Sequence, residues 1–124
     1  MRREQRLRAN ADFARVRRDG RSWSHPVCVL FATPGGGSDG QTRVGVTVGR
    51  WAAGAVVRNR ARRRIREAVR LRYDEIELGW DLVFAVRSAV TEVPFDAITR
   101  AVDTLLVRAR LLRAEAACAD PRSS

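Results

Sequence analysis

The chain has 124 residues, 45% of them hydrophobic, and this fits one folded domain with a modest core rather than a disordered chain. No segment approaches the run of about 18 apolar residues that a membrane-spanning helix needs. The N-terminal stretch is basic but lacks the apolar run of a signal peptide, so we expect a soluble, cytoplasmic protein.

Positive charge dominates the composition. The chain has 24 basic residues, all of them arginine, against 14 acidic residues, and its formal net charge is +10. Such an excess on a small domain is typical of a protein that binds nucleic acid. An anionic membrane surface is the competing partner, but that partner favours a basic helix with bulky apolar residues on its opposite face. We therefore expect a nucleic-acid partner and no membrane contact.

The first half of the chain is predicted to form a helix followed by strands. Asn10 is a suitable N-cap for a short helix, and Gly20 is placed to end it. A short strand fits around residues 21–23, and apolar runs of strand length follow at 27–33 and 43–48. We expect the last two strands to form an antiparallel pair, with the glycine-rich segment between them as a hairpin connection.

The middle of the chain carries an unusually basic helix. Residues 56–70 include seven arginines, and the net charge from Arg58 to Arg72 is +7, because eight arginines stand against one acid there. On a helical wheel the apolar residues gather on one side, where they would face the core, and most of the arginines cover the other side. The predicted core side consists of Val57, Ala61, Ile65, Ala68 and Val69.

The last part of the chain is predicted to contain one strand and one helix. An acidic turn at 73–81 ends the basic helix, and residues 81–86 form a buried strand. Apolar residues at alternating spacings of three and four predict an amphipathic helix over about residues 95–113. We expect residues 1–114 to form a single domain and residues 115–124 to be a frayed tail.

The charge on the basic helix is almost unbalanced by acids. Solvated helix faces usually mix signs through pairs three or four residues apart, whereas this helix holds one acid, Glu67. Like charges at such density destabilise the isolated fold, and a polyanion that binds and releases its counterions offsets that repulsion. Arginine also presents a planar fork that suits phosphate groups. The helix is therefore predicted to bind nucleic acid, with a solvated face as the alternative.

Catalytic and metal-binding residues are not evident. Metal-assisted cleavage of a phosphodiester needs carboxylates that converge on a cation. The one dense acidic group follows the basic helix, where we interpret it as a solvated turn, with a metal-dependent nuclease as the alternative. A single histidine, His25, excludes a His-based acid–base pair, and Cys28 and Cys118 are expected to be reduced thiols, so we predict no catalytic residue and no metal ligand. The acidic group consists of Asp74, Glu75, Glu77 and Asp81.

Aromatic residues have two readings in this sequence. An aromatic side chain on a strand or a neighbouring helix can stack on unpaired bases. Phe13 and Phe31 also suit packing in the core, which is the more common role of such residues, and the sequence leaves both roles open. The tryptophans are predicted to be packing residues, and for Trp51, beside Arg50 and before the basic helix, a role as a base platform is the alternative.

Residues 55–67 resemble the signature of the protein subunit of bacterial ribonuclease P. The run Arg-Asn-Arg at 58–60, followed by a basic pair and another arginine, is the specific part of that signature. The resemblance extends over about residues 6–112, nearly the whole chain. The family's opening helix, the strand before its motif and its last strand resemble, in that order, residues 6–13, 43–48 and 81–87.

The resemblance implies an α+β fold: a two-layer sandwich of three helices and a four-stranded mixed sheet, related to a ribosomal-protein domain. It also implies a left-handed crossover into the motif helix, against the strong preference for right-handed connections. In function it implies a protein cofactor of a ribozyme. The catalytic RNA subunit then holds the active site and its Mg²⁺ ions, and the protein binds that RNA and the 5′ leader of precursor tRNA, which is removed endonucleolytically. A structural RNA-binding protein of the ribosome is a further alternative.

Position by position, the resemblance also implies roles for single residues. Arg17 stands where the family commonly has an aromatic residue, Trp51 where it often has lysine, and Gly54 is shifted relative to the family's glycine. Leader preference, the class of partner RNA and homodimerisation of the free protein are left open. The implied contacts to the catalytic RNA are Arg58, Asn59, Arg60, Arg62, Arg63 and Arg66, with Arg50 near the end of the leader cleft. The residues implied to line that cleft are Phe13, Arg17, Phe31 and Thr47.

Overall fold

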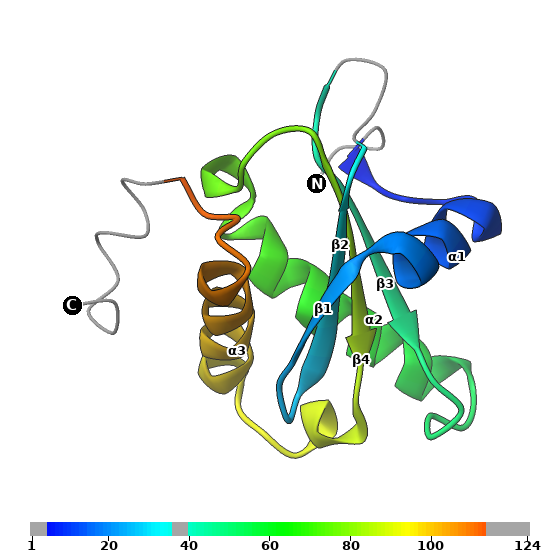
Figure 1. The fold of residues 1–124 in the computed structure, drawn as a ribbon. Helices are drawn as coiled ribbons and strands as arrows, with labels where there is room; N and C mark the ends of the chain where they lie inside the picture. Colours follow the sequence, from blue (N-terminus) through cyan, green and yellow to red (C-terminus); the bar gives the residue numbers. More distant parts are fainter. Residues whose placement is uncertain (1–4, 36–39, 114–124) are drawn as a thin grey trace.

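A computed structural model describes residues 5–35 and 40–113 of the chain (Figure 1). The predicted order of helices and strands is confirmed, including the short strand after the first helix. No helix among these residues is long and apolar enough to cross a bilayer. The tail predicted over 115–124 lies outside the described residues. The elements are α1 (Asn10–Asp19), β1 (Arg21–Ser24), β2 (Cys28–Pro34), β3 (Arg43–Val48), α2 (Ala55–Arg70), η2 (Tyr73–Glu75), β4 (Trp80–Val86), η3 (Ser88–Thr91) and α3 (Phe95–Arg108).

The four strands form one mixed sheet in the order β1-β2-β4-β3. β1 and β4 are both antiparallel to β2, and β3 is parallel to β4. The predicted antiparallel pair of β2 and β3 is therefore wrong, and the segment between these strands is not a hairpin connection. β4 takes the position between them because consecutive residues from Asp81 to Phe84 are buried, and a central strand covered on both faces can bury every residue.

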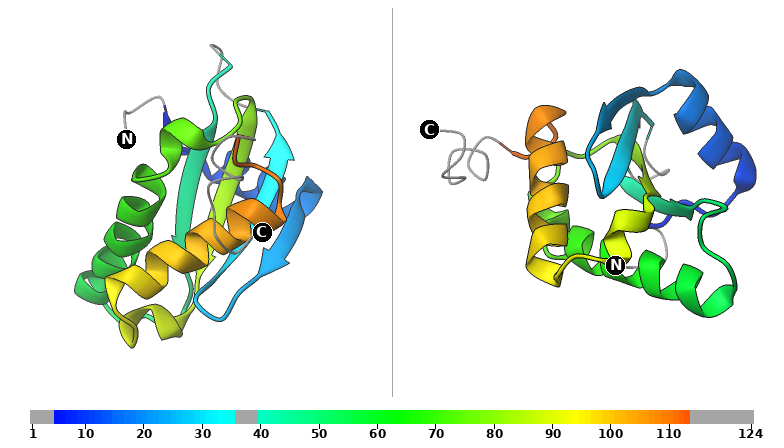
Figure 2. Two further views of the ribbon diagram at one scale, coloured as in Figure 1. Left: turned by 90° about the vertical axis from the view of Figure 1, so that its left-hand side faces the viewer. Right: turned by 90° about the horizontal axis from the view of Figure 1, so that it is seen from below.

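The connection from β3 through α2 to β4 is left-handed, as the resemblance implied. β3 and β4 both point down in Figure 1, β4 lies to the left of β3, and α2 lies behind the sheet. The side view in Figure 2 also places α2 on that side of the sheet. Parallel connections are right-handed in nearly all proteins, so this topology is a specific feature of the fold.

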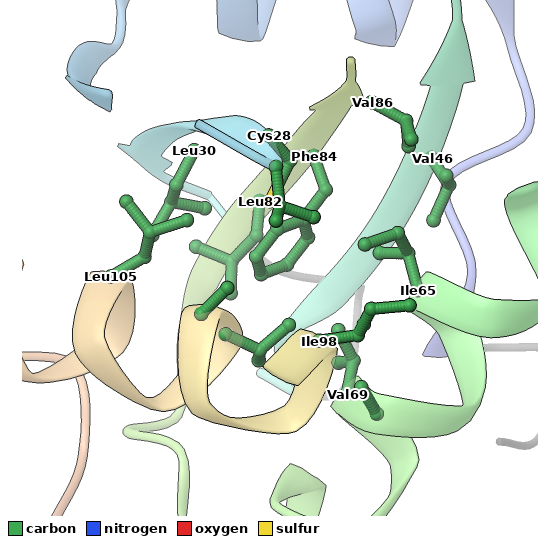
Figure 3. Packing of buried hydrophobic residues seen from close by; sticks show 14 of the residues in the cluster. Cys28, Leu30, Val46, Ile65, Val69, Leu82, Phe84, Val86, Ile98 and Leu105 are labelled. Carbon is green, nitrogen blue, oxygen red and sulfur yellow. The ribbon is translucent and has the colours of Figure 1, made fainter. Parts of the chain in front are cut away.

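The main core lies between the sheet and the pair of helices α2 and α3 (Figure 3). Leu30 of β2 and Phe84 of β4 come together there with Ile65 of α2 and with Ile98 and Leu105 of α3, and all five are fully buried. The α+β class with three helices and a four-stranded mixed sheet is confirmed: α2 and α3 cover one face of the sheet, and α1 packs on the other (Figure 2). The smaller cluster under α1 consists of Leu7, Val16 and Val83, with Phe13 and Phe31 packed against it.

The last helix ends earlier than its apolar spacing predicts. α3 stops at Arg108, because Arg110 takes a left-handed φ of 58° and turns the chain. Leu111 and Leu112 are nevertheless buried. They continue the apolar pattern because they fill the core from the segment after the helix.

Two smaller differences concern the other helices. Asn10 is the first residue of α1 rather than its cap, since Ala9 takes the cap position without a side-chain hydrogen bond. Val57, predicted for the core side of α2, is 38% exposed. The rest of the predicted core side is buried: Ala61, Ile65, Ala68 and Val69.

Candidate nucleic-acid interface

Two of the seven arginines of α2 are used within the fold. Arg64 donates hydrogen bonds to the main-chain oxygens of Val90 (2.7 Å) and Val93 (2.8 Å). Arg70 forms an ion pair with Glu67 one turn earlier on the helix. These side chains therefore have protein partners for their N–H groups.

The other five arginines of α2 form no ion pair within the described residues. Arg58 makes one long contact, 3.4 Å to the main-chain oxygen of Val48, and Arg62 donates to Oδ1 of Asn59 at 3.2 Å. Since no carboxylate from residues 5–35 or 40–113 occupies their guanidinium groups, these five are available to phosphate. We call them the α2 ridge: Arg58, Arg60, Arg62, Arg63 and Arg66.

A groove of about 590 Å³ runs beside the ridge, between α1, β3 and α2. α1 contributes Phe13 to it, and β3 contributes Thr47. The structure thus brings two residues predicted for the leader cleft next to four residues predicted for the catalytic RNA. Those four are Arg58, Asn59, Arg62 and Arg66.

The segment before α1 adds two arginines that the sequence reasoning did not identify. Its main chain runs along β3, where Arg6 bridges Val44. Arg8 lines the groove. The pKa of Arg66 is lowered, first by burial and then by the nearby charges of Arg6 and Arg62. Nε of Arg6 is buried and has no hydrogen-bond partner in the part of the chain described. The available signal was the position of both arginines in the segment that resembles the family's opening.

Phe13 and Phe31 each have one side in the core and another that is accessible. Both pack against the cluster under α1, and both are partly exposed. The ring of Phe13 lies over Gly45 of β3, where a Cβ atom would come within 2.5 Å of the ring. The guanidinium carbon of Arg17 lies 5.2 Å from the centroid of Phe31, a cation–π geometry. Core packing therefore leaves part of each ring free for a further contact.

An open strip of the sheet connects the groove with the pair of Arg17 and Phe31. Val29 lies two residues before Phe31 on the same face of β2. It is paired with Ala85 of β4, and Ala85 is paired in turn with Thr47 of β3. These three residues are partly exposed. Val29 and Ala85 were not identified from the sequence, because small apolar residues in a strand carry no signal of binding.

The acidic group after α2 does not form one site. Asp81 is fully buried and accepts hydrogen bonds from Arg43 at 3.0 and 2.9 Å and from Arg15. Its prediction as part of a solvated turn was wrong, since it ties α1 to the sheet. Glu75 pairs with Arg72. Among the residues that the structure describes, no three His, Cys, Asp or Glu side chains are grouped so that they could hold a metal ion.

The turn before α2 is fixed by a tryptophan and a glycine. Nε1 of Trp51 donates to the main-chain oxygen of Val86 (2.9 Å), and the ring packs against the core, which confirms its packing role. Gly54 takes the N-cap position before α2 with a φ of 86°, a conformation that favours glycine. Arg50 is exposed in this turn and does not line the groove.

The sequence matches the family model described as Ribonuclease P over residues 1–110. It is 45% identical over 111 residues to the "Ribonuclease P protein component" of Herpetosiphon aurantiacus, covering 90% of this chain and 89% of that protein. The protein component of Roseiflexus castenholzii is 46% identical over 114 residues, covering 91% and 92%.

Solved structures give the same family. The RNase P protein from Thermotoga maritima has a TM-score of 0.72 at 29% identity, over 83% of this chain and 96% of that one. A Staphylococcus aureus RNase P protein mutant, described as defective in mRNA degradation activity, has a TM-score of 0.76 at 26% identity, over 87% and 90%.

Proposed function

The chain belongs to the ribonuclease P protein family, the protein cofactor of an RNA enzyme in tRNA processing, and on this premise we propose which surface meets which RNA. The α2 ridge binds the catalytic RNA subunit. The groove beside it and the open strip of the sheet bind the 5′ leader of precursor tRNA. One observation carries this assignment: the ridge arginines form no ion pair within the described residues, and three of them, Arg58, Arg62 and Arg66, border a groove that holds an accessible aromatic ring.

Binding at the α2 ridge is driven by charge. Each arginine that meets a phosphate releases counterions from the RNA, so the affinity depends strongly on salt. The ridge lies along one helix whose other face is buried against the sheet and α3, so the spacing of its arginines is set before the RNA arrives. Such preorganisation reduces the entropy lost on binding.

The 5′ leader is the part of precursor tRNA that mature tRNA lacks. Proteins commonly bind single-stranded RNA by stacking its bases on aromatic rings and guanidinium planes. Phe13 in the groove and the pair of Arg17 and Phe31 beyond the strip offer such surfaces. Thr47 lines the groove and the strip, whose small side chains let an extended strand approach the sheet. Leader contacts then favour precursor over mature tRNA.

In this proposal the chain itself performs no bond chemistry. Its described residues offer no converging carboxylates, and the arginines beside the groove repel a cation, so this surface does not fit a Mg²⁺ site. We assign hydrolysis to the RNA subunit together with Mg²⁺ held by RNA phosphates. The protein neutralises phosphates so that the catalytic RNA and the leader can approach each other. We place this work in the cytoplasm, where a bacterium makes its tRNA precursors.

A cleavage assay tests the proposal. Precursor tRNA is incubated at low Mg²⁺ with the protein alone, with the RNA subunit alone and with both together. We expect removal of the leader in the combined reaction and little in the other two. Cleavage by the protein alone would support a metal-dependent nuclease, and no stimulation by the protein would support a structural RNA-binding protein of the same fold.

A further inference from the structure

A second hollow lies on the other side of α2, where the start of the helix meets η3. Its volume is about 210 Å³. Since the groove described above opens between α2 and α1, the two hollows flank the helix. We call this one the valine pocket, after the apolar residues that line it: Val56, Val57 and Ala61 of α2 and Val90 of η3, with the side chain of Thr91 beside them.

The two valines at the start of α2 are unusually exposed for apolar residues. Val56 is 82% exposed and Val57 is 38% exposed. A single apolar residue on a surface needs no explanation, but adjacent ones that border a hollow are typical of a binding site. Here they stand at the beginning of the most basic helix of the chain.

Two arginines frame the valine pocket. Arg64 is held by its hydrogen bonds to the main-chain oxygens of Val90 and Val93, so its alkyl chain forms a fixed wall. Arg60 also lines the pocket and belongs to the α2 ridge, where it has no ion pair or hydrogen bond to the described residues. An apolar hollow with a free guanidinium at its edge suits a flat ring system joined to a phosphate.

We propose that the valine pocket binds one unstacked base of the catalytic RNA, while Arg60 contacts a phosphate of the same strand. This inference rests on the proposed function of the α2 ridge. Sites for drug-sized ligands measure roughly 300–1,000 Å³, and a hollow of about 210 Å³ suits a single base better.

The position of the valine pocket favours RNA over a second copy of this chain. Arg60 belongs both to the pocket and to the α2 ridge, so an RNA strand that lies on the ridge reaches the pocket without leaving the helix. Another copy would bring a second net charge of +10 toward the same arginines. Like charges brought together across an interface are unfavourable.

The test compares two exposed apolar residues. Val56→Ala removes apolar surface from the valine pocket. Leu78→Ala is the matched control, because Leu78 is 61% exposed and lines neither hollow. Exposed positions tolerate such changes, and the Tm of each variant checks this. Affinity is measured at one salt concentration for the RNA subunit and for heparin, a polyanion without bases.

We expect Val56→Ala to weaken binding of the RNA subunit by roughly fivefold to tenfold, because two methyl groups lose burial against the base. Binding of heparin should be unchanged, and Leu78→Ala should match the wild type with both ligands. In the complex with the wild-type protein, at least one RNA base should be protected from dimethyl sulfate. The same base should become reactive in the complex with the Val56→Ala variant.

Three results would overturn the valine pocket as a base site. The first is that the Val56→Ala variant binds the RNA subunit as tightly as the wild type does. The second is that the variant loses as much affinity for heparin as for the RNA subunit. The third is that the substitution changes self-association of the protein and leaves its RNA affinity unchanged. Failure of the wild-type protein to stimulate the RNA subunit would remove the proposed function and the pocket together. Normal stimulation with an unaffected Val56→Ala variant would remove the pocket alone.

Discussion

Two neighbouring arginines of α2 should respond in opposite ways to the same substitution. Arg63 is exposed and belongs to the α2 ridge, whereas Arg64 donates to the main-chain oxygens of Val90 and Val93. Arg63→Ala should change the free energy of unfolding by less than about 0.5 kcal/mol. It should flatten the slope of log affinity against log salt by about 0.7 to 0.9, the contribution of one phosphate contact.

Arg64→Ala should act on the fold instead. A hydrogen bond from a charged donor contributes about 1.5–3 kcal/mol, and Arg64 makes two that share one partly exposed side chain, so we expect a loss of about 2–3 kcal/mol. The salt slope should change much less than in Arg63→Ala, because the N–H groups of Arg64 already have partners.

Urea denaturation and a salt titration of RNA binding measure both quantities on each variant. An unchanged salt slope for Arg63→Ala would show that Arg63 does not contact a phosphate and does not belong to the α2 ridge. If Arg64→Ala flattened the salt slope as much as Arg63→Ala does and left the stability unchanged, Arg64 would belong to the α2 ridge and not to the fold.

Three further predictions concern the other face of the sheet and the core. Asp81→Asn should lower the free energy of unfolding, measured by urea denaturation, by about 2–4 kcal/mol. This is near the low end of the range for breaking a buried ion pair, because Arg15 and Arg43 keep contact with water. An unchanged stability would contradict the role of the ion pairs of Asp81 with these two arginines. Burial raises the pKa of the Cys28 thiol to about 12, so iodoacetamide at pH 8 should modify Cys28 only in unfolded protein. Peptide mapping separates Cys28 from Cys118, and rapid labelling of Cys28 in the native protein would refute its burial. Phe31→Ala should reduce the preference for precursor over mature tRNA and leave assembly with the RNA subunit nearly intact, whereas an unfolded variant would assign Phe31 to the core alone.

The parts of the fold that depend on local periodicity could be predicted from the sequence. α2 was predicted because its apolar residues and its arginines separate at helical spacing. The order of the strands could not be predicted in this way, because pairing depends on which distant segment fills the position beside β2. The run from Leu82 to Phe84 indicated a buried strand, and its place at the centre of the sheet required the fold itself.

The candidate site shows the same limit at the level of single side chains. Arg63 and Arg64 are adjacent residues of the same type. Arg64 is held by hydrogen bonds to the main-chain oxygens of Val90 and Val93, whereas Arg63 has no partner among the residues that the structure describes, and no local pattern in the sequence distinguishes them. Asp81 stood among other acids in the sequence, yet the register of β4 with β3 places it beside Arg43. The role of Arg6 likewise follows from its main-chain bridge to β3, which no local pattern indicates.

The salt dependence of binding to the RNA subunit tests the central claim most directly. If the five arginines of the α2 ridge each meet a phosphate, they should contribute about −3.5 to −4.5 to the slope of log affinity against log salt. A folded variant with glutamine at all five positions should lose that contribution and should no longer stimulate cleavage of precursor tRNA at low Mg²⁺. A variant that keeps the wild-type slope and the wild-type stimulation would contradict the account.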